Sequence, residues 1–183
     1  MVSGDGLKKY TATAIVVHWA MAAGIVGIFL FGRYMADLPV SPAKLKYYSW
    51  HKWAGVTLFA LLAFRIVWRA THRPPELPVH MSRGERFVAH AGHAALYLLM
   101  IAVPLSGWLM SSAKGIQTVY FGVWPIPDLL AKNDELAKLL QTAHWALNML
   151  LAAVVIGHVA AALKHHFLDR DDVLTRMLPS KNT

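Results

Sequence analysis

Residues 141–163 are QTAHWALNMLLAAVVIGHVAAAL, an uncharged apolar run that holds His144 and His158 fourteen residues apart. The run is long enough for a membrane-spanning helix, which needs roughly 20 apolar residues. In an α-helix, fourteen residues rise about 21 Å and return to within about 40° of the same face. An ionisable side chain inside a membrane helix is rare and is a functional hypothesis by default. The two histidines therefore predict one functional stripe at two depths of a bilayer.

The rest of the chain has the composition of an integral membrane protein. Its 183 residues are 56% hydrophobic and only 15% charged, with a mean hydropathy of +0.41. Apolar stretches predict helices at about 10–33, 47–70, 86–113 and 139–166. We expect an all-α, four-helix transmembrane bundle that forms a single domain over residues 1–183. The first helix lacks a convincing cleavage site and is expected to be retained.

The lysines and arginines predict the orientation of the bundle. With four spans, both termini and the middle loop share one side, and that side holds eleven of the 18 Lys and Arg residues. This excess predicts that both termini are cytoplasmic, as in a multi-pass protein of a bacterial inner membrane. Nucleic-acid binding is not expected, because the charge is split between two faces. The eleven residues are Lys8, Lys9, Arg65, Arg69, Arg73, Arg83, Arg86, Lys164, Arg170, Arg176 and Lys181.

The connections between the helices contain helix-breaking residues. The first, residues 33–46, includes Pro42, and the middle one is also rich in proline. The third, residues 114–138, is the longest, and its amphipathic, aromatic-rich sequence predicts a lid or a short interfacial helix on the outer surface. Pro104 is expected to kink the third helix, with Ser106 bonding the carbonyl that the proline frees.

Two further histidines, His18 and His51, complete a pattern of depths. His51 and His144 belong near the outer side, and His18 and His158 near the cytoplasmic side. Each pair joins two different helices, as ligation of one haem iron by two imidazoles requires. The chain has no cysteine, which excludes iron–sulfur clusters, thiol catalysis and covalent haem attachment. The pattern predicts two non-covalent b haems with these four histidines as iron ligands.

His90 and His93 leave the inner pair open to alternatives. They are three residues apart on the third helix and therefore share a face near the cytoplasmic side. Either could replace His18 or His158 as a ligand. The fourteen-residue spacing on the last helix favours His158.

The order of these motifs resembles the bacterial di-haem cytochrome b561 family, which is related to the b-type cytochrome subunits of membrane hydrogenases. The motifs are IVVHW (15–19), HKWAG (51–55), AHAGHAALYLL (89–99), PLSG (104–107) and the histidines of the last helix. The resemblance covers about residues 8–180 and is strongest to the superoxide oxidases of the family. It implies His18 and His158 as ligands of one haem and His51 and His144 as ligands of the other, with superoxide as electron donor and ubiquinone as acceptor.

Cationic residues and histidines around the four ligands suggest supporting roles. Arg65 and Arg69 could pair with haem propionates, or could simply anchor the cytoplasmic side. Ubiquinone is expected to bind near residues that can bond its oxygens and supply protons, namely His93, His165, Arg73 and Arg86. A basic outer rim is expected to attract an anion such as superoxide, and consists of Lys44, Lys46 and Lys52.

Two other functions remain compatible with the sequence. The chain could be a haem-b subunit that passes electrons between a partner dehydrogenase or cytochrome and the quinone pool. It could instead be a haem-free membrane protein whose histidines bind a metal or carry protons. A reduced-minus-oxidised spectrum separates the last hypothesis from the others.

Overall fold

The computed structural model describes residues 9–78 and 81–179 of the chain. Four helices in this part are long and apolar enough to cross a membrane. Large apolar side chains such as Val16, Leu30 and Val67 are exposed on them, as expected of surfaces that face lipid. The predicted all-α transmembrane fold is confirmed. The helices are α1 (Ala12–Ala36), α2 (Pro42–Thr71), α3 (Arg83–Ala113) and α4 (Asp134–Phe167).

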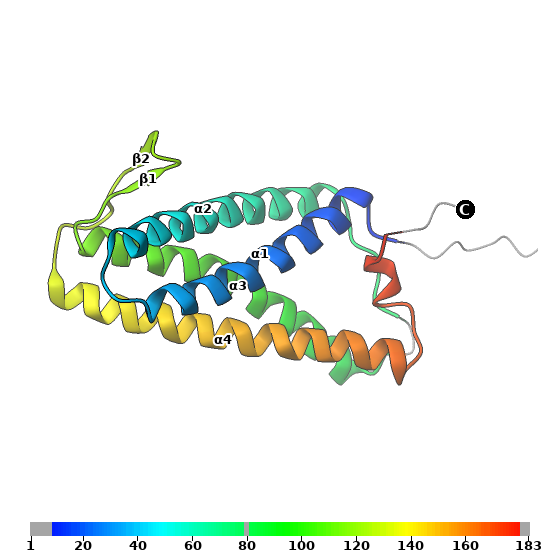
Figure 1. Cartoon of the computed structure of the whole chain (residues 1–183). Helices are drawn as coiled ribbons and strands as arrows, with labels where there is room; N and C mark the ends of the chain where they lie inside the picture. Colours follow the sequence, from blue (N-terminus) through cyan, green and yellow to red (C-terminus); the bar gives the residue numbers. More distant parts are fainter. Residues whose placement is uncertain (1–8, 79–80, 180–183) are drawn as a thin grey trace, which may run out of the picture.

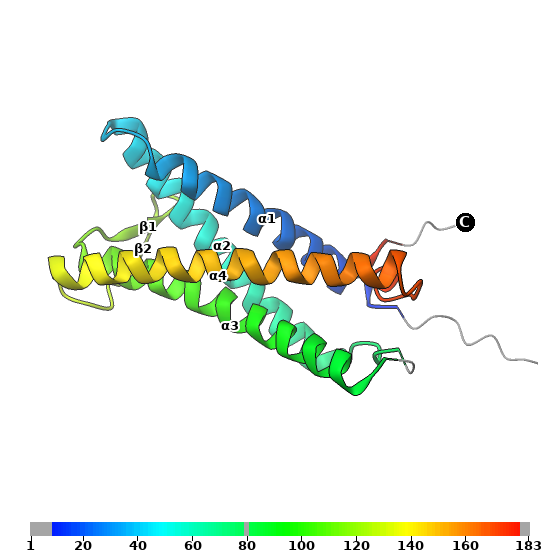
Figure 2. The same cartoon turned by 90° about the horizontal axis from the view of Figure 1, so that it is seen from below.

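The four helices form two antiparallel hairpins (Figure 1). α1 packs against α2, α3 packs most extensively against α4, and α2 joins the hairpins through α3. In contrast, α4 makes little contact with α1 or α2. The start of α1 and the end of α4 lie at the same end of the bundle (Figures 1 and 2), which we call the terminal end. Of the cations that predict a cytoplasmic location for this end, Lys8 and Lys181 lie outside the described residues.

Side-chain caps explain why α2 and α4 begin before their apolar runs. Ser41 precedes Pro42, and its hydroxyl accepts a bond from the backbone N–H of Lys44 at 3.2 Å. Asn133 caps α4 in the same way. These polar caps satisfy backbone donors that the first helical turn leaves free. As a result α2 and α4 each begin five residues earlier than predicted (42 against 47, and 134 against 139).

The long third connection contains a β-hairpin, so the predicted interfacial helix is wrong. Strands β1 (Thr118–Tyr120) and β2 (Trp124–Ile126) pair antiparallel. Phe121 and Gly122 both have positive φ, at 50° and 73°, as a tight hairpin turn requires. Prolines in and after β2 also oppose a helix there. We call the end of the bundle that carries this β-hairpin, opposite the terminal end, the hairpin end.

Hydrogen bonds fasten this connection to the helices. The indole Nε1 of Trp53 on α2 donates to the carbonyl of Val119 at 2.7 Å. Trp108 on α3 donates to the carbonyl of Pro127 at 3.0 Å. The hydroxyl of Thr57 also lies 2.9 Å from that of Tyr120. The connection is therefore fixed to α2 and α3, and its β-hairpin lies beside α2 near this end of the bundle (Figure 1).

Pro104 lies inside α3, which remains helical through it. A proline cannot donate to the carbonyl four residues earlier, here that of Met100. The predicted role of Ser106 is not the one observed, because its hydroxyl donates to the carbonyl of Val103 at 2.7 Å.

Candidate functional site: histidines paired at two levels

The hairpin-end pair consists of His51 on α2 and His144 on α4. Their ring centroids lie 6.5 Å apart and the ring planes are nearly perpendicular, at 82°. Both side chains are half-buried. The two residues come from helices that make little contact with each other, so the pair joins the two helical hairpins across the bundle.

Each of these rings lies against a glycine of the neighbouring helix, which is α1 for His51 and α3 for His144. A Cβ atom on Gly32 of α1 would lie 2.9 Å from Cε1 of His51. A Cβ atom on Gly107 of α3 would lie 3.1 Å from Cε1 of His144. Such distances are shorter than ordinary van der Waals contact. The two glycines therefore define where the rings can lie.

The terminal-end pair consists of His18 on α1 and His158 on α4, with ring centroids 6.2 Å apart. His93 on α3 also faces His158, at 5.6 Å. His18 reaches His158 from the other helical hairpin, whereas His93 is on the helix that packs against α4. His90 differs from His93 because its side chain is exposed. The structure thus brings three of the four predicted inner candidates together and leaves His90 outside.

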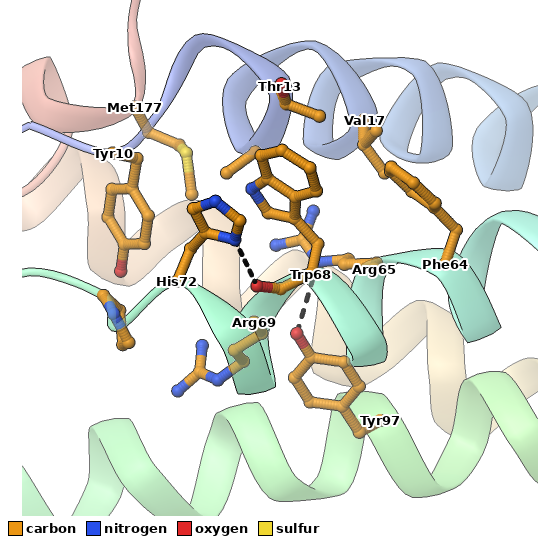
Figure 3. A pocket seen from close by; sticks show the side chains of 12 residues that line it. Tyr10, Thr13, Val17, Phe64, Arg65, Trp68, Arg69, His72, Tyr97 and Met177 are labelled. Atoms are coloured by element: carbon orange, nitrogen blue, oxygen red, sulfur yellow. Dashed lines mark hydrogen bonds between the residues drawn. The ribbon is translucent and has the colours of Figure 1, made fainter.

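Arg65, fourteen residues after His51 on α2, lies beside this cluster. The guanidinium interacts electrostatically with His18, His93 and His158. Its Nε donates to the hydroxyl of Tyr97 at 3.3 Å (Figure 3). A half-buried cation at this position can balance the charge of an anionic group bound between the helices.

Figure 3 shows a small pocket on the α1–α2 side of Arg65. The rings of Trp68 and His72 stack there at 3.9 Å, and Arg69 lies 5.9 Å from the ring of Tyr97. The pocket volume is about 30 Å³. That volume holds about one water molecule, so this pocket as it stands does not admit a quinone ring.

The three lysines of the predicted outer rim have different surroundings. Lys44 donates to the carbonyls of Ala36 and Leu38 and so closes the α1–α2 turn. The Lys46 ammonium lies 5.0 Å from the ring centre of Trp50. Lys52, next to His51, donates to the carbonyl of Ile116 at 3.1 Å.

Lys114 is a fourth cation at the hairpin end, and the predicted rim did not include it. It interacts electrostatically with both Lys52 and His144. Its ammonium donates to Oε1 of Gln141 at 2.8 Å, and burial lowers the pKa of Lys114. Lys52 and Lys114 are 62 positions apart in sequence, so only the tertiary fold makes them neighbours.

The four residues predicted to bind a quinone have separate partners. His93 faces His158, and Arg86 donates to the carbonyl of Pro78 at 3.2 Å. Nδ1 of His165 lies 2.7 Å from a carboxylate oxygen of Asp171 and 3.1 Å from one of Asp169. Arg73 is exposed in the connection after α2. All four lie at or near the terminal end, but these contacts do not join them into one pocket.

The spacing of the paired rings fits a metal ion between them. Two opposed imidazoles that each bind a metal at about 2 Å hold their ring centroids roughly 6 Å apart. Both the hairpin-end and the terminal-end pair have this separation. Nδ1 of His51 is also buried without a hydrogen-bond partner among the described residues. The donors therefore suit a haem iron at each level.

Fold and site together define a four-helix membrane protein with histidines paired at two depths. The chain belongs to the prokaryotic cytochrome b561 family, whose sequence model matches residues 9–180. The predicted family membership is confirmed. The chain is thus a multi-pass bacterial membrane protein for electron transfer, in a family that binds b-type haem.

Three relatives resemble the chain over nearly their whole lengths. Cytochrome b561 homolog 2 of Escherichia coli is 34% identical, over 93% of this chain and 92% of its own. The probable superoxide oxidase CybB of Yersinia pestis is 29% identical, over 95% and 98%. Cytochrome b562 of Cereibacter sphaeroides is 30% identical, over 92% and 94%.

The glycines beside the hairpin-end pair provide a first prediction. Gly32→Ala and Gly107→Ala should each weaken haem retention at this pair, because the added methyl group must displace the ring of His51 or His144. Haem per chain after detergent washing measures the effect. Gly27→Ala is the control, since nothing lies within 4 Å of its added Cβ atom. Equal haem retention in Gly27→Ala and Gly32→Ala would contradict the packing argument.

Proposed function

We propose that the chain is a di-haem b oxidoreductase that takes electrons from superoxide at the hairpin end and passes them to ubiquinone at the terminal end. The observation that carries this proposal is the pairing of four histidines at two levels, with ring separations of 6.5 and 6.2 Å. Transfer across the membrane needs two such centres in series. The similarity to the probable superoxide oxidase CybB of Yersinia pestis supports superoxide as the donor.

His51 and His144 would hold one haem, and His18 and His158 the other. A b haem with two imidazole ligands supplies reversible one-electron chemistry and has no open position for oxygen. Arg65 and Arg69 would neutralise propionate groups, for which a guanidinium is well suited. The protein's own contribution is then the depth, orientation and electrostatic environment of each histidine pair.

Lys52 and Lys114 are the cations that we assign to the attraction of superoxide. Both lie near the hairpin-end pair, whereas Lys44 closes a turn and Lys46 covers a tryptophan ring. Converging positive charges raise the local concentration of a small anion and its rate of encounter. Two superoxide anions would each release one electron and leave as dioxygen.

The terminal end would complete the reaction with a quinone. Reduction of ubiquinone to ubiquinol takes the two electrons and two protons. His165, hydrogen-bonded to Asp171 and close to Asp169, is a group that can hold a proton and release it to a bound quinone. Arg73, Arg86 and His93 are donors for the quinone oxygens. This site is proposed from side-chain chemistry, since its residues do not share one pocket.

A stopped-flow experiment on the purified, haem-loaded chain tests the function. Superoxide should reduce the haems, as measured by their b-type absorbance after rapid mixing. Ubiquinone added afterwards should reoxidise the haems. Reduction by dithionite but not by superoxide would overturn the proposal. Reduction by ubiquinol alone would then favour a haem-b subunit that serves a partner dehydrogenase or cytochrome. Folded protein without a b-type band would favour haem-free metal or proton chemistry.

Removal of the positive charges of Lys52 and Lys114 should slow the reduction of the haems by superoxide, and not their reoxidation. We expect the double variant Lys52→Gln, Lys114→Gln to be reduced by superoxide several-fold more slowly, with a weaker dependence on ionic strength. Reoxidation by ubiquinone should not change. The double variant Lys9→Gln, Arg83→Gln removes the same charge at the terminal end and is the control. The assignment is wrong if both double variants slow superoxide equally.

A further inference from the structure

One hydrogen-bonded contact between α3 and α4 involves the hairpin-end pair directly. The hydroxyl of Ser106, whose residue is only 6% exposed, lies 2.9 Å from Nδ1 of His144. The same hydroxyl donates to the carbonyl of Val103 at 2.7 Å. That carbonyl in turn lies 3.1 Å from Nδ1 of His144. A serine hydroxyl often bonds a carbonyl of the preceding turn of its own helix, but the contact with a histidine 38 positions away is additional.

The Val103 carbonyl determines which nitrogen of His144 carries the proton. A carbonyl oxygen only accepts hydrogen bonds, so a ring nitrogen beside it must be the donor. Nδ1 is therefore protonated, and Nε2 is left with a lone pair for a metal ion. The Ser106 hydroxyl fits this arrangement, since it donates to Val103 and accepts from the Nδ1 proton.

His51 has no equivalent support. Its Nδ1 is buried and has no hydrogen-bond partner among the described residues. The neighbouring Gly32 positions the ring by packing alone. The two members of the hairpin-end pair are thus unequal, and only His144 has a fixed tautomer.

We propose that Ser106 is a positioning residue that fixes the ring plane of His144 and accepts a hydrogen bond from its Nδ1 proton, and so tunes the haem bound at the hairpin-end pair. This proposal rests on the proposed function, in which His144 is an iron ligand. When an imidazole binds a metal through one ring nitrogen, a hydrogen bond donated by its other ring nitrogen orients the ring and raises its basicity as a ligand. Ser106 therefore stabilises the oxidised iron at this level relative to a ligand without that bond.

The test compares Ser106→Ala with Ser106→Thr, which keeps the hydroxyl. Ser111→Ala is the matched control, because Ser111 is on the same helix, is only 4% exposed and donates to the carbonyl of Ile116 at 2.6 Å. Redox titration followed by absorbance gives the potentials of the two haems. Low-spin EPR reports the relative orientation of the two ligand planes. The His144→Ala variant, which should keep only the other haem, assigns the signals.

Ser106→Ala should raise the potential of the hairpin-end haem and change its EPR signal, because the Nδ1 proton loses the nearer of its two acceptors. The terminal-end haem should not change, and Ser106→Thr and Ser111→Ala should resemble the unsubstituted protein. An unchanged potential and EPR signal in Ser106→Ala, or an equal shift in Ser111→Ala, would overturn the proposal.

A haem-free measurement keeps the proposal testable if Ser106→Ala loses the cofactor. In apoprotein with ¹⁵N-labelled histidine, His144 should be the Nδ1–H tautomer, and Ser106→Ala should shift its Nδ1 resonance, because the proton then has only the Val103 carbonyl as acceptor. An unchanged Nδ1 resonance in that variant would rule out the role of Ser106. Failure of the unsubstituted chain to bind haem would instead refute the proposed function, and the ¹⁵N measurement would still decide the role of Ser106.

Discussion

The haem content of the purified chain should fall from two per chain to about one when His144 is replaced by alanine. The same loss is expected for His51→Ala. Either change leaves the hairpin-end pair with one imidazole, and the ring centroids that lie 6.5 Å apart can no longer hold an iron from both sides. The terminal-end pair uses other residues and should keep its haem.

The pyridine haemochrome assay, related to protein concentration, measures this stoichiometry. Ser49→Ala is a suitable control on the same helix as His51, since the Ser49 hydroxyl donates to the carbonyl of Leu45 in the preceding turn. Two haems per chain in either histidine variant would show that the hairpin-end pairing is wrong. A haem-free but folded variant would show that the two sites are not independent.

Much of the fold was predictable because membrane helices leave a strong signal in sequence. The four apolar runs and the shared end of the termini follow from composition and helix geometry. The helix starts were less predictable, because the polar caps Ser41 and Asn133 extend α2 and α4 beyond their apolar runs. The β-hairpin was not predicted, because the aromatic-rich, amphipathic sequence of residues 114–138 is also typical of an interfacial helix. The Phe-Gly turn and the following prolines were the available signal.

The depth of each histidine was also predictable, but its surroundings were not. Spacing along one helix sorts residues by level, and the structure indeed brings His51 to His144 and His18 to His158. The contacts that give a role to Gly32, Ser106 and Lys114 are with side chains of another helix, and the sequence alone does not show which side chains these are. A glycine at the depth of a paired histidine was the one sequence signal that could have pointed to Gly32 and Gly107.

Helix packing separates the two candidates for the partner of His158. His93 lies closer, with ring centroids 5.6 Å apart, but it is on α3, which packs tightly along α4. His18 lies 6.2 Å away on α1, which makes little contact with α4. A porphyrin is a wide, flat group that needs space on all sides of its iron. The α1–α4 pairing meets this requirement better than the α3–α4 pairing, because α1 and α4 pack together so little, and α2 and α4 are related in the same way at the hairpin end.

His158→Ala and His18→Ala should therefore each remove the terminal-end haem, whereas His93→Ala and His90→Ala should keep it. Haem per chain and the redox titration of the remaining haem measure the outcome, with the hairpin-end haem as internal reference. His90 serves as the control because its side chain is exposed on the same helix as His93. Loss of the haem in His93→Ala with retention in His18→Ala would move the ligand to α3. In that case α3 and α4 must separate to admit the porphyrin, and the extent of helix packing would not predict where this haem binds.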